Sequence, residues 1–305
     1  MKKSAKLVFF GTDDFAVPSL RALLDDGWQV SAVVTKPDTR AGRGLQLKVS
    51  GIKKITQKHS IKKIFQPDNL AEIEHEIAAL KPKLGILVAY GKLIPEKFID
   101  LFPGGIINVH PSLLPVWRGP SPIEAAILNG DKQTGISLMR LTASMDTGPV
   151  YAQTVVALGG SEDRLGLAHG LAEKGARFLV EKLPEIINGS IKPIPQDNSK
   201  SSYSQLLNKE DGWLDTDRPA EVLERQVRAY FGFPKSRIKL FTKHEVVITK
   251  AQVANPPAGG ENDGRLIIKC NPGWLEILEL IAPSGRTISG RDFLRGYQEQ
   301  PEIRN

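Results

Sequence analysis

An amide and an imidazole stand two residues apart in the segment GIINVHPSLLPVWRG, residues 105–119. The apolar run before them predicts a strand, and side chains alternate along a strand, so Asn108 and His110 point to the same side. An amide N–H can stabilise a developing oxyanion and an imidazole can move a proton, so this pair suits acyl transfer. Two ordinary polar residues at a strand end are the structural alternative.

A carboxylate follows in Ser-Met-Asp-Thr-Gly-Pro, where Asp146 occupies a turn after a predicted strand over residues 136–141. There it could lie at the same sheet edge, orient the His110 ring and set its protonation. By itself the turn is weak evidence, because Asp-Thr-Gly sequences commonly just form turns. His, Cys, Asp and Glu show no metal-ligand spacing, so we predict no metal site.

The elements that position these residues alternate between short apolar runs and helical patterns. This alternation predicts an α/β, doubly wound, mostly parallel sheet, Rossmann-like in arrangement, whose ligands bind beyond the carboxyl ends of the strands. The turn at Gly11 lacks the GxGxxG pattern of a dinucleotide site. The expected strands are 6–10, 30–34, 84–89, 105–109 and 136–141, and the expected helices are 15–25, 49–59, 70–80, 95–101 and 122–129.

The composition changes after a long helical pattern that runs from residue 161 toward Pro184. Residues 188–204 are rich in Ser, Pro and Asn, which indicates a linker. A helical pattern over 220–230 and four short β-rich runs then predict a small β-barrel of the oligonucleotide-binding (OB-like) type. We therefore expect a catalytic domain over 1–187, a linker over 188–208 and a β-barrel domain over 209–305.

Charge is unevenly distributed along the chain, whose formal net charge is +7. Residues 35–63 hold nine Lys and Arg against one Asp, a net charge of +8, and residues 235–250 hold five against one Glu, a net charge of +4. Two such clusters suit a polyanion such as RNA. A solvated helix face and a lysine-rich strand would account for the same counts.

Composition places the chain among ordinary globular proteins, with 305 residues, 41% hydrophobic and 25% charged. The single cysteine, Cys270, excludes an internal disulfide and fits a reducing compartment. Membrane-spanning helices need about 20 apolar residues, and no apolar stretch approaches that length. We therefore expect a cytoplasmic protein with no membrane partner.

Three motifs together resemble the methionyl-tRNA formyltransferase family of folate-dependent formyltransferases: NVHPSLLPVWRGPSPI, MDTGP downstream of it, and AGRG in the early loop. The resemblance covers nearly the whole chain. It implies transfer of a formyl group from 10-formyltetrahydrofolate to the α-amino group of methionine on initiator methionyl-tRNA. It also implies that Asn108, His110 and Asp146 are the catalytic trio, and that the folate site contains Ala89, Tyr90, Gly91, Ser112, Leu113, Leu114 and Pro115.

The same resemblance implies that the two basic clusters bind tRNA. The loop over residues 36–47, with Lys36, Arg40 and Arg43, would enter the acceptor arm of the tRNA. The second domain would bind phosphates of the tRNA through Lys235, Arg237, Lys239 and Lys243. We also expect the enzyme to be a monomer. One departure concerns the second domain, because residues 230–234 read Tyr-Phe-Gly-Phe-Pro where the family commonly has Asn-Pro-Trp-Pro.

Other functions remain open on the sequence. A formyltransferase acting on a nucleotide-linked amino sugar would share the trio and the folate motif. A small sugar substrate, however, does not require a neighbouring segment with a net charge of +8. Glycinamide ribonucleotide formyltransferase is a shorter, single-domain enzyme, and Asp13 and Asp14 suit its phosphate site badly. A catalytically silent RNA-binding protein would not need the trio. A formyl-transfer assay distinguishes such a protein from a formyltransferase.

Overall fold

The structure is a computed structural model that describes residues 4–41, 46–48, 50–59, 61–241, 244–256 and 264–297. Arg43 and Lys243 lie outside the described residues. The chain divides into two compact units. The first consists of Met1–Pro122, Gln133–Ala157 and Ala168–Ser204, and the second consists of Ile123–Lys132, Leu158–Leu167 and Gln205–Asn305.

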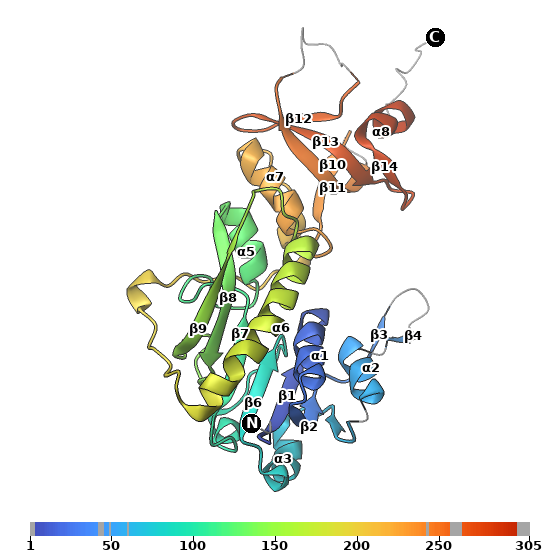
Figure 1. Cartoon of the computed structure of the whole chain (residues 1–305). Coiled ribbons are helices and arrows are strands. Elements are labelled where there is room, and N and C mark those ends of the chain that lie inside the picture. The colour runs from blue at the N-terminus through green and yellow to red at the C-terminus, as the bar shows by residue number, and fades with distance from the viewer. Residues whose placement is uncertain are drawn as a thin grey trace, which may run out of the picture. The chain divides into compact units, whose positions relative to one another are not determined.

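A seven-stranded sheet forms the centre of the first unit, in the order β5-β2-β1-β6-β7-β8-β9 (Figure 1). The strands are β1 (Lys6–Gly11), β2 (Gln29–Val34), β5 (Ile64–Phe65), β6 (Leu84–Val88), β7 (Ile106–His110), β8 (Gln133–Arg140) and β9 (Val150–Ala157). The first five run parallel to their neighbours, and β8 and β9 are antiparallel. The predicted doubly wound, mostly parallel sheet is therefore confirmed. Its strand order reverses between β1 and β6, where such folds bind ligands.

Helices cover both faces of this sheet. They are α1 (Val17–Asp25), α2 (Gly51–Lys58), α3 (Glu74–Leu80), α4 (Glu96–Ile99) and the part of α6 (Arg164–Asn188) from Ala168 onward. Helix α5 (Pro122–Asn129) falls, apart from Pro122, in the second unit. On one face, Phe10 packs edge-on against Tyr90, Phe98 and Phe102, so that β1, α4 and the turn after β6 share one aromatic core.

Helix α6 lies on the opposite face. At Gly175 it comes so close that a β-carbon would stand 3.2 Å from Cγ1 of Val109. Val109 thus faces α6, and its neighbours Asn108 and His110 point to the other face by alternation. The sequence predicts that this helix runs toward Pro184, but it continues through that residue to Asn188. No helix within the described residues is both long enough and apolar enough to cross a membrane.

The segment 194–204 has the Ser- and Asn-rich composition that predicts a linker, yet it is hydrogen-bonded to the first unit along its length. We call this segment the strap. Ile194 pairs with Val150 through two backbone bonds of 2.8 Å. Farther along, Ser204 N donates to the carbonyl of Arg118 at 2.7 Å, and Arg118 N donates to the carbonyl of Ser202 at 2.9 Å. Its small polar residues supply the donors and acceptors that an exposed segment needs to dock onto a loop.

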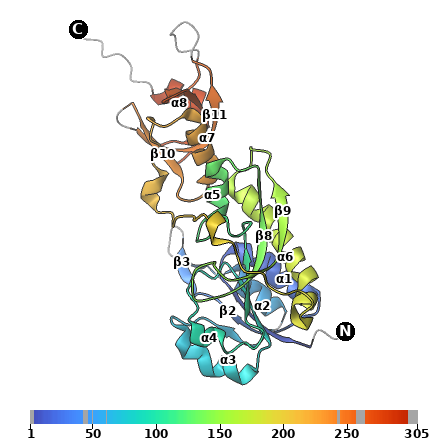
Figure 2. The same ribbon diagram turned by 90° about the vertical axis from the view of Figure 1, so that its left-hand side faces the viewer.

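The second unit contains a five-stranded antiparallel sheet in the order β10-β11-β13-β12, with β14 also paired to β13 (Figure 1). Figure 2 shows β10 and β11 in a second view. Its elements are α7 (Ala220–Ala229), β10 (Ser236–Leu240), β11 (His244–Ala254), β12 (Ile267–Lys269), β13 (Trp274–Ile281), β14 (Thr287–Ser289) and α8 (Gly290–Tyr297). Leu223 and Val227 of α7 and Phe293 of α8 bury their side chains in its core, together with Cys270. The predicted small β-rich domain is confirmed.

The early basic loop forms a small hairpin. Strands β3 (Thr39–Ala41) and β4 (Gln46–Lys48) pair antiparallel, with Arg40 opposite Leu47. Asp38, directly before the hairpin, accepts hydrogen bonds from Lys53 and Gln66. The hairpin is therefore anchored where it leaves the sheet.

Candidate active site

Asn108, His110 and Asp146 meet at the carboxyl end of β7. Asn108 Nδ2 donates to Oδ1 of Asp146 at 3.2 Å, and Nδ1 of His110 lies 3.8 Å from Oδ2 of the same carboxylate. Asn108 and His110 are 7% and 4% exposed. Asp146 is partly buried. Buried polar groups such as Asn108 and His110 need partners inside the protein, because they lose their hydrogen bonds to water.

The His110 ring is fixed from both sides. Its Nε2 lies 3.0 Å from the carbonyl oxygen of Trp117, which can only accept, so Nε2 carries a proton and donates. The Nδ1 atom faces Asp146 at a distance too long for a hydrogen bond. Nδ1 is therefore the ring nitrogen that remains available to exchange a proton.

Asp146 reaches this site by a route that differs from the expected one. From the sequence, we expect the carboxyl end of the preceding strand to share an edge with His110. Strand β8 is instead antiparallel, and Arg140 pairs with Ile107, before Asn108. The loop 141–149 returns to β7 instead. Asp146 itself has φ of +51°, a left-handed conformation that is costly for a residue with a side chain.

Main-chain groups of the loop after β7 complete the cluster. Gly119 N donates to Oδ2 of Asp146 at 2.9 Å, and Trp117 supplies the carbonyl for His110. Both belong to the WRG sequence, whose side chains gave no indication of these contacts. Every residue type has the same backbone carbonyl, and all except proline have a backbone N–H. The sequence can therefore indicate such contacts only through the motif that contains them.

The turn 89–91 lies beside the trio. Leu87 pairs with Asn108 in register, so Ala89 stands level with His110 one step beyond the end of β6. Ala89 and Gly91 are exposed and have positive φ. The Tyr90 side chain is 1% exposed and lies in the aromatic core, where burial raises its pKa to about 12. The main chain of this turn is therefore exposed beside the trio.

The segment 112–115 is held by internal contacts. Ser137 Oγ donates to the carbonyl of Ser112 at 2.6 Å and accepts from Leu114 N at 3.0 Å. Gln153 donates to the carbonyl of Leu114 at 2.9 Å. Ser112 is fully buried and Leu114 is 5% exposed, whereas Leu113 and Pro115 are partly exposed. Of the four predicted folate residues, the latter two can offer apolar surface to a ligand.

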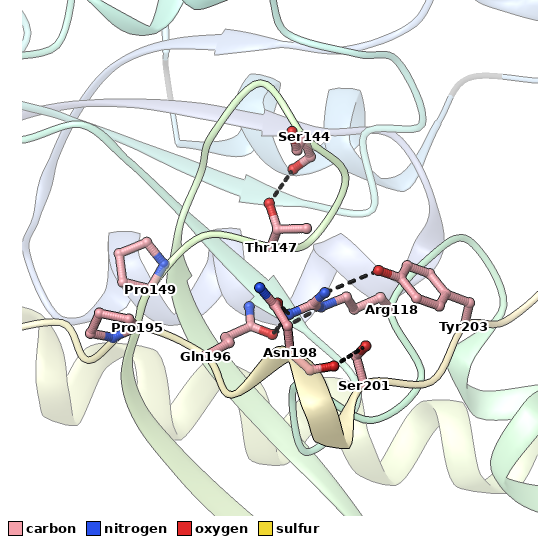
Figure 3. A pocket seen from close by; sticks show the side chains of 9 residues that line it. All are labelled: Arg118, Ser144, Thr147, Pro149, Pro195, Gln196, Asn198, Ser201 and Tyr203. Carbon is pink, nitrogen blue, oxygen red and sulfur yellow. Dashed lines mark hydrogen bonds between the residues drawn. The ribbon is translucent and has the colours of Figure 1, made fainter.

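A cavity of about 550 Å³ opens beside the Asp146 loop (Figure 3). Its wall combines the loop, the strap and Arg118, and its lining residues are Arg118, Ser144, Thr147, Pro149, Pro195, Gln196, Asn198, Ser201 and Tyr203. Arg118 is 1% exposed. No sequence pattern predicted a role for Gln196, and the one signal for Arg118 is its place between Trp and Gly in the HPSLLPVWRG motif.

The predicted tRNA-binding residues occupy separate places. Arg237 and Lys239 lie on the same face of β10, because the buried residues of this strand are the alternate ones. Lys239 Nζ stands 5.9 Å from the centre of the exposed Trp213 ring, and Arg237 forms an ion pair with Glu245 at 3.7 Å. Lys235 is exposed, just before β10. Cationic and aromatic side chains thus share one surface of the second unit.

Lys36, at the end of β2, lies next to the turn 89–91. A β-carbon at Gly91 would stand 2.6 Å from Nζ of Lys36. The backbone of Arg40 is in β3. Lys36 is therefore placed beside the predicted folate segment, although it was predicted as a tRNA contact.

Two family models match this chain. The model described as formyl transferase matches residues 5–183, and the model described as formyl transferase, C-terminal domain, matches residues 206–298. A methionyl-tRNA formyltransferase from Halorhodospira halophila is 39% identical over 305 residues, covering 98% of both chains. One from Sulfurihydrogenibium sp. is 37% identical over 305 residues, covering 96% of this chain and 97% of the other.

Solved structures share the fold. WlaRD, described as a sugar 3N-formyl transferase, has a TM-score of 0.66 at 22% identity and covers 91% of this chain and 97% of its own. The N-formyltransferase from Helicobacter canadensis has a TM-score of 0.68 at 19% identity, covering 90% and 98%. Their descriptions name 5-N-formyl-THF and folinic acid as bound ligands of those two proteins.

Proposed function

Because this chain belongs to the formyl transferase family, we propose that it transfers a formyl group from 10-formyltetrahydrofolate to the α-amino group of methionine on initiator methionyl-tRNA. The observation that carries the proposal is the buried cluster of Asn108, His110 and Asp146 at the ligand-binding edge of the sheet. Relatives named for this activity support it over 98% of the chain. The proposed domain boundaries are 1–187 and 209–305, with 188–208 between them.

The acceptor needs little activation. An α-amino group has a pKa of roughly 7.7–8.0, so a usable neutral fraction is present near pH 7. Its nitrogen attacks the formyl carbon, a C–N bond forms, and the bond between that carbon and the folate nitrogen breaks. One proton leaves the attacking amine and one reaches the departing nitrogen.

Each residue of the trio has a distinct task in this proposal. Asn108 uses one amide hydrogen on Asp146 and keeps the other for the oxyanion that develops on the formyl oxygen. His110 moves the proton at Nδ1, since Nε2 is already bonded to the Trp117 carbonyl. Asp146 orients both side chains and offsets the charge of the imidazolium.

The two substrates would use different surfaces. The formyl donor would lie against the turn 89–91, with Leu113 and Pro115 contacting its ring, and Ser112 and Leu114 shaping the site from within. The tRNA would meet Arg40 and Arg43 of the early basic loop and, in the second domain, Lys235, Arg237, Lys239 and Lys243. Lys36 would serve whichever substrate lies beside Gly91. We expect a monomeric enzyme that works in the cytoplasm, where the lone Cys270 would stay reduced.

The decisive experiment offers labelled 10-formyltetrahydrofolate in parallel with methionyl initiator tRNA, methionyl elongator tRNA and a nucleotide-linked 4-amino sugar. Label on the initiator tRNA alone is the expected result. Label on the sugar alone would support the proposed trio and formyl donor but would show that the acceptor is a sugar and not a tRNA. That result would agree with the fold shared with the sugar formyltransferases. No label on any acceptor would favour a silent RNA-binding protein.

A further inference from the structure

Arg118 carries a charge that no acid neutralises among the partners found for it in the described residues. Its Nη1 donates to the hydroxyl of Tyr203 at 3.0 Å, and its Nη2 donates to Oδ1 of Asn198 at 2.8 Å. Its other bonds go to Gln196, again a neutral group. Burying a guanidinium costs free energy, and Arg118 is 1% exposed. A charge that is buried beside the trio at such a cost indicates a functional role.

Gln196 links this arginine to the catalytic loop. Its Oε1 accepts from Nε and Nη2 of Arg118 at 3.0 and 2.8 Å. Its Nε2 donates to the carbonyls of Asp146 and Gly148 at 2.8 and 2.7 Å (Figure 3 shows the side chains). Both donors and both lone pairs of the amide are thereby used, which fixes its orientation.

The loop that Gln196 holds is under strain. The loop passes so close to Arg140 that a β-carbon at Gly148 would lie 1.8 Å from its carbonyl oxygen, which leaves no room for a side chain there. The strain lies at Asp146, whose φ of +51° is in the left-handed region. Such a conformation persists only when the surroundings determine it. Gln196 supplies bonds to the carbonyls on both sides of residue 147, and those bonds resist the relaxation of Asp146 toward an ordinary conformation.

We infer that Gln196, oriented by Arg118, is a positioning residue that holds the Asp146 carboxylate against Asn108 and His110. This inference deepens the proposed function and rests on it. Arginine suits the task because its planar fork places two N–H groups on one amide oxygen, which a lysine cannot do. The strap thus takes part in the site through Gln196.

Two substitutions separate positioning from stability. Gln196→Ala removes both bonds to the loop. Gln196→Glu also removes them, because a carboxylate accepts and does not donate, but it gives Arg118 an acidic partner. Tyr203→Phe is the matched control, since it takes one acceptor from the same guanidinium and contacts neither carbonyl of the loop.

We expect kcat to fall about 10- to 100-fold in both Gln196 variants, by analogy with the loss that follows removal of a hydrogen-bond partner of a metal-binding residue. KM for each substrate should stay within about twofold, and Gln196→Glu should unfold at or above the wild-type temperature. Tyr203→Phe should keep kcat within about twofold. A kcat near wild type in both Gln196 variants, or a loss of kcat that follows the loss of stability, would overturn the inference.

An independent readout keeps this inference separate from the proposed function. Gly119 N–H donates to Asp146, so its hydrogen exchange, measured by NMR, reports the position of the carboxylate without any transfer assay. We expect faster exchange in both Gln196 variants and no change in Tyr203→Phe. If the wild-type protein transfers formyl to no acceptor, the proposed function fails, whereas unchanged exchange at Gly119 rejects the positioning role.

Discussion

At the scale of single residues, the three side chains of the site differ in which of their hydrogen-bonding groups are already used. His110 has Nε2 occupied by a carbonyl, Asn108 has one amide hydrogen occupied by Asp146, and Asp146 accepts from Asn108 and Gly119. Within the described part of the chain, Nδ1 of His110 and the second amide hydrogen of Asn108 have no hydrogen-bond partner. The geometry therefore prepares one proton-transfer group and one oxyanion donor for the reaction.

His110→Ala should abolish most of the transfer while leaving a folded protein. General acid-base catalysis by a positioned histidine contributes about 10²- to 10⁴-fold, and we expect kcat to fall within that range. The check is single-turnover transfer to initiator methionyl-tRNA, with far-UV circular dichroism to confirm folding. His75→Ala, on the exposed face of α3, is the control and should leave the rate unchanged. A His110→Ala variant with a near-normal rate would exclude this ring from the mechanism.

Gly148 is a second residue at which a small change should have a large effect. A methyl group there would overlap the carbonyl of Arg140, so the loop carrying Asp146 would have to move. We expect Gly148→Ala to lower kcat strongly and to cost about 1–3 kcal/mol of unfolding free energy, which is typical of overpacking. Urea unfolding and the transfer assay measure the two effects.

Gly170→Ala provides the contrast for that experiment. Gly170 lies inside α6 with no atom within 4 Å of an added β-carbon. Alanine is the better helix former, so this variant should gain roughly 0.5–1 kcal/mol and keep its activity. If Gly148→Ala behaved like Gly170→Ala, the strain assigned to the loop would be absent.

At the scale of elements, hydrophobic periodicity predicted four of the five parallel strands and their helices to within a few residues, and it missed the two-residue strand β5. The strands it identified are buried on both faces, which makes them continuous apolar runs such as LVFF at 7–10. Strand β9 was missed because alternate residues along it are exposed, which dilutes the apolar signal. The direction of β8 was missed because periodicity does not distinguish a parallel strand from an antiparallel one.

The candidate site was predictable to a similar extent. Asn108 and His110 follow from the period of a strand, and Asp146 from its motif. Gln196 did not follow, because a Ser- and Pro-rich composition predicts a linker whether or not its side chains dock. The partners of Gln196 and Asp146 are main-chain groups, and these look alike at every position of a sequence.

The anchor of the early hairpin should make stability depend on acid pH. A hydrogen bond from Lys53 lowers the pKa of Asp38 below its ordinary value of 3.8. The stabilisation is fully present above the unfolded pKa of 3.8 and is lost as the pH falls through the lower, folded value. Asp38→Asn should therefore cost about 0.2–1 kcal/mol at pH 7 and progressively less below about pH 4.

Thermal unfolding at pH 7 and at pH 3 measures that dependence, with the exposed Asp100→Asn as the control. The difference between wild type and Asp38→Asn should shrink at pH 3, whereas Asp100→Asn should match wild type at pH 7. An Asp38→Asn difference that grew on acidification would contradict the sign derived from the lowered pKa.

At the scale of the whole molecule, basic side chains lie on both units, and their effect on a polyanion should depend on salt. Each phosphate contact releases counterions, so the logarithm of affinity falls with the logarithm of salt concentration. Arg237→Ala combined with Lys239→Ala should reduce the magnitude of that slope by about 2 for initiator tRNA. The transfer rate at saturating tRNA should change little, because neither residue touches the trio.

Filter binding of initiator tRNA at several salt concentrations gives the slope. Lys97→Ala is the control, because Lys97 is paired with Glu74 on the first unit. It should leave the slope unchanged. An unaltered slope in the double variant would show that phosphates are held elsewhere on the protein.

The pairing of the strap with the loop after β7 has a consequence for biosynthesis. Backbone bonds join Arg118 to Ser202 and Ser204, which are made more than 80 residues later. Contacts of such sequence separation form late, because the intervening chain must first be ordered. A nascent chain that has emerged only to residue 187 would carry all three members of the trio but not Gln196. Catalytic competence should therefore arrive in a step near the end of translation of the first unit, and ribosome-bound fragments ending before and after residue 204 would time it.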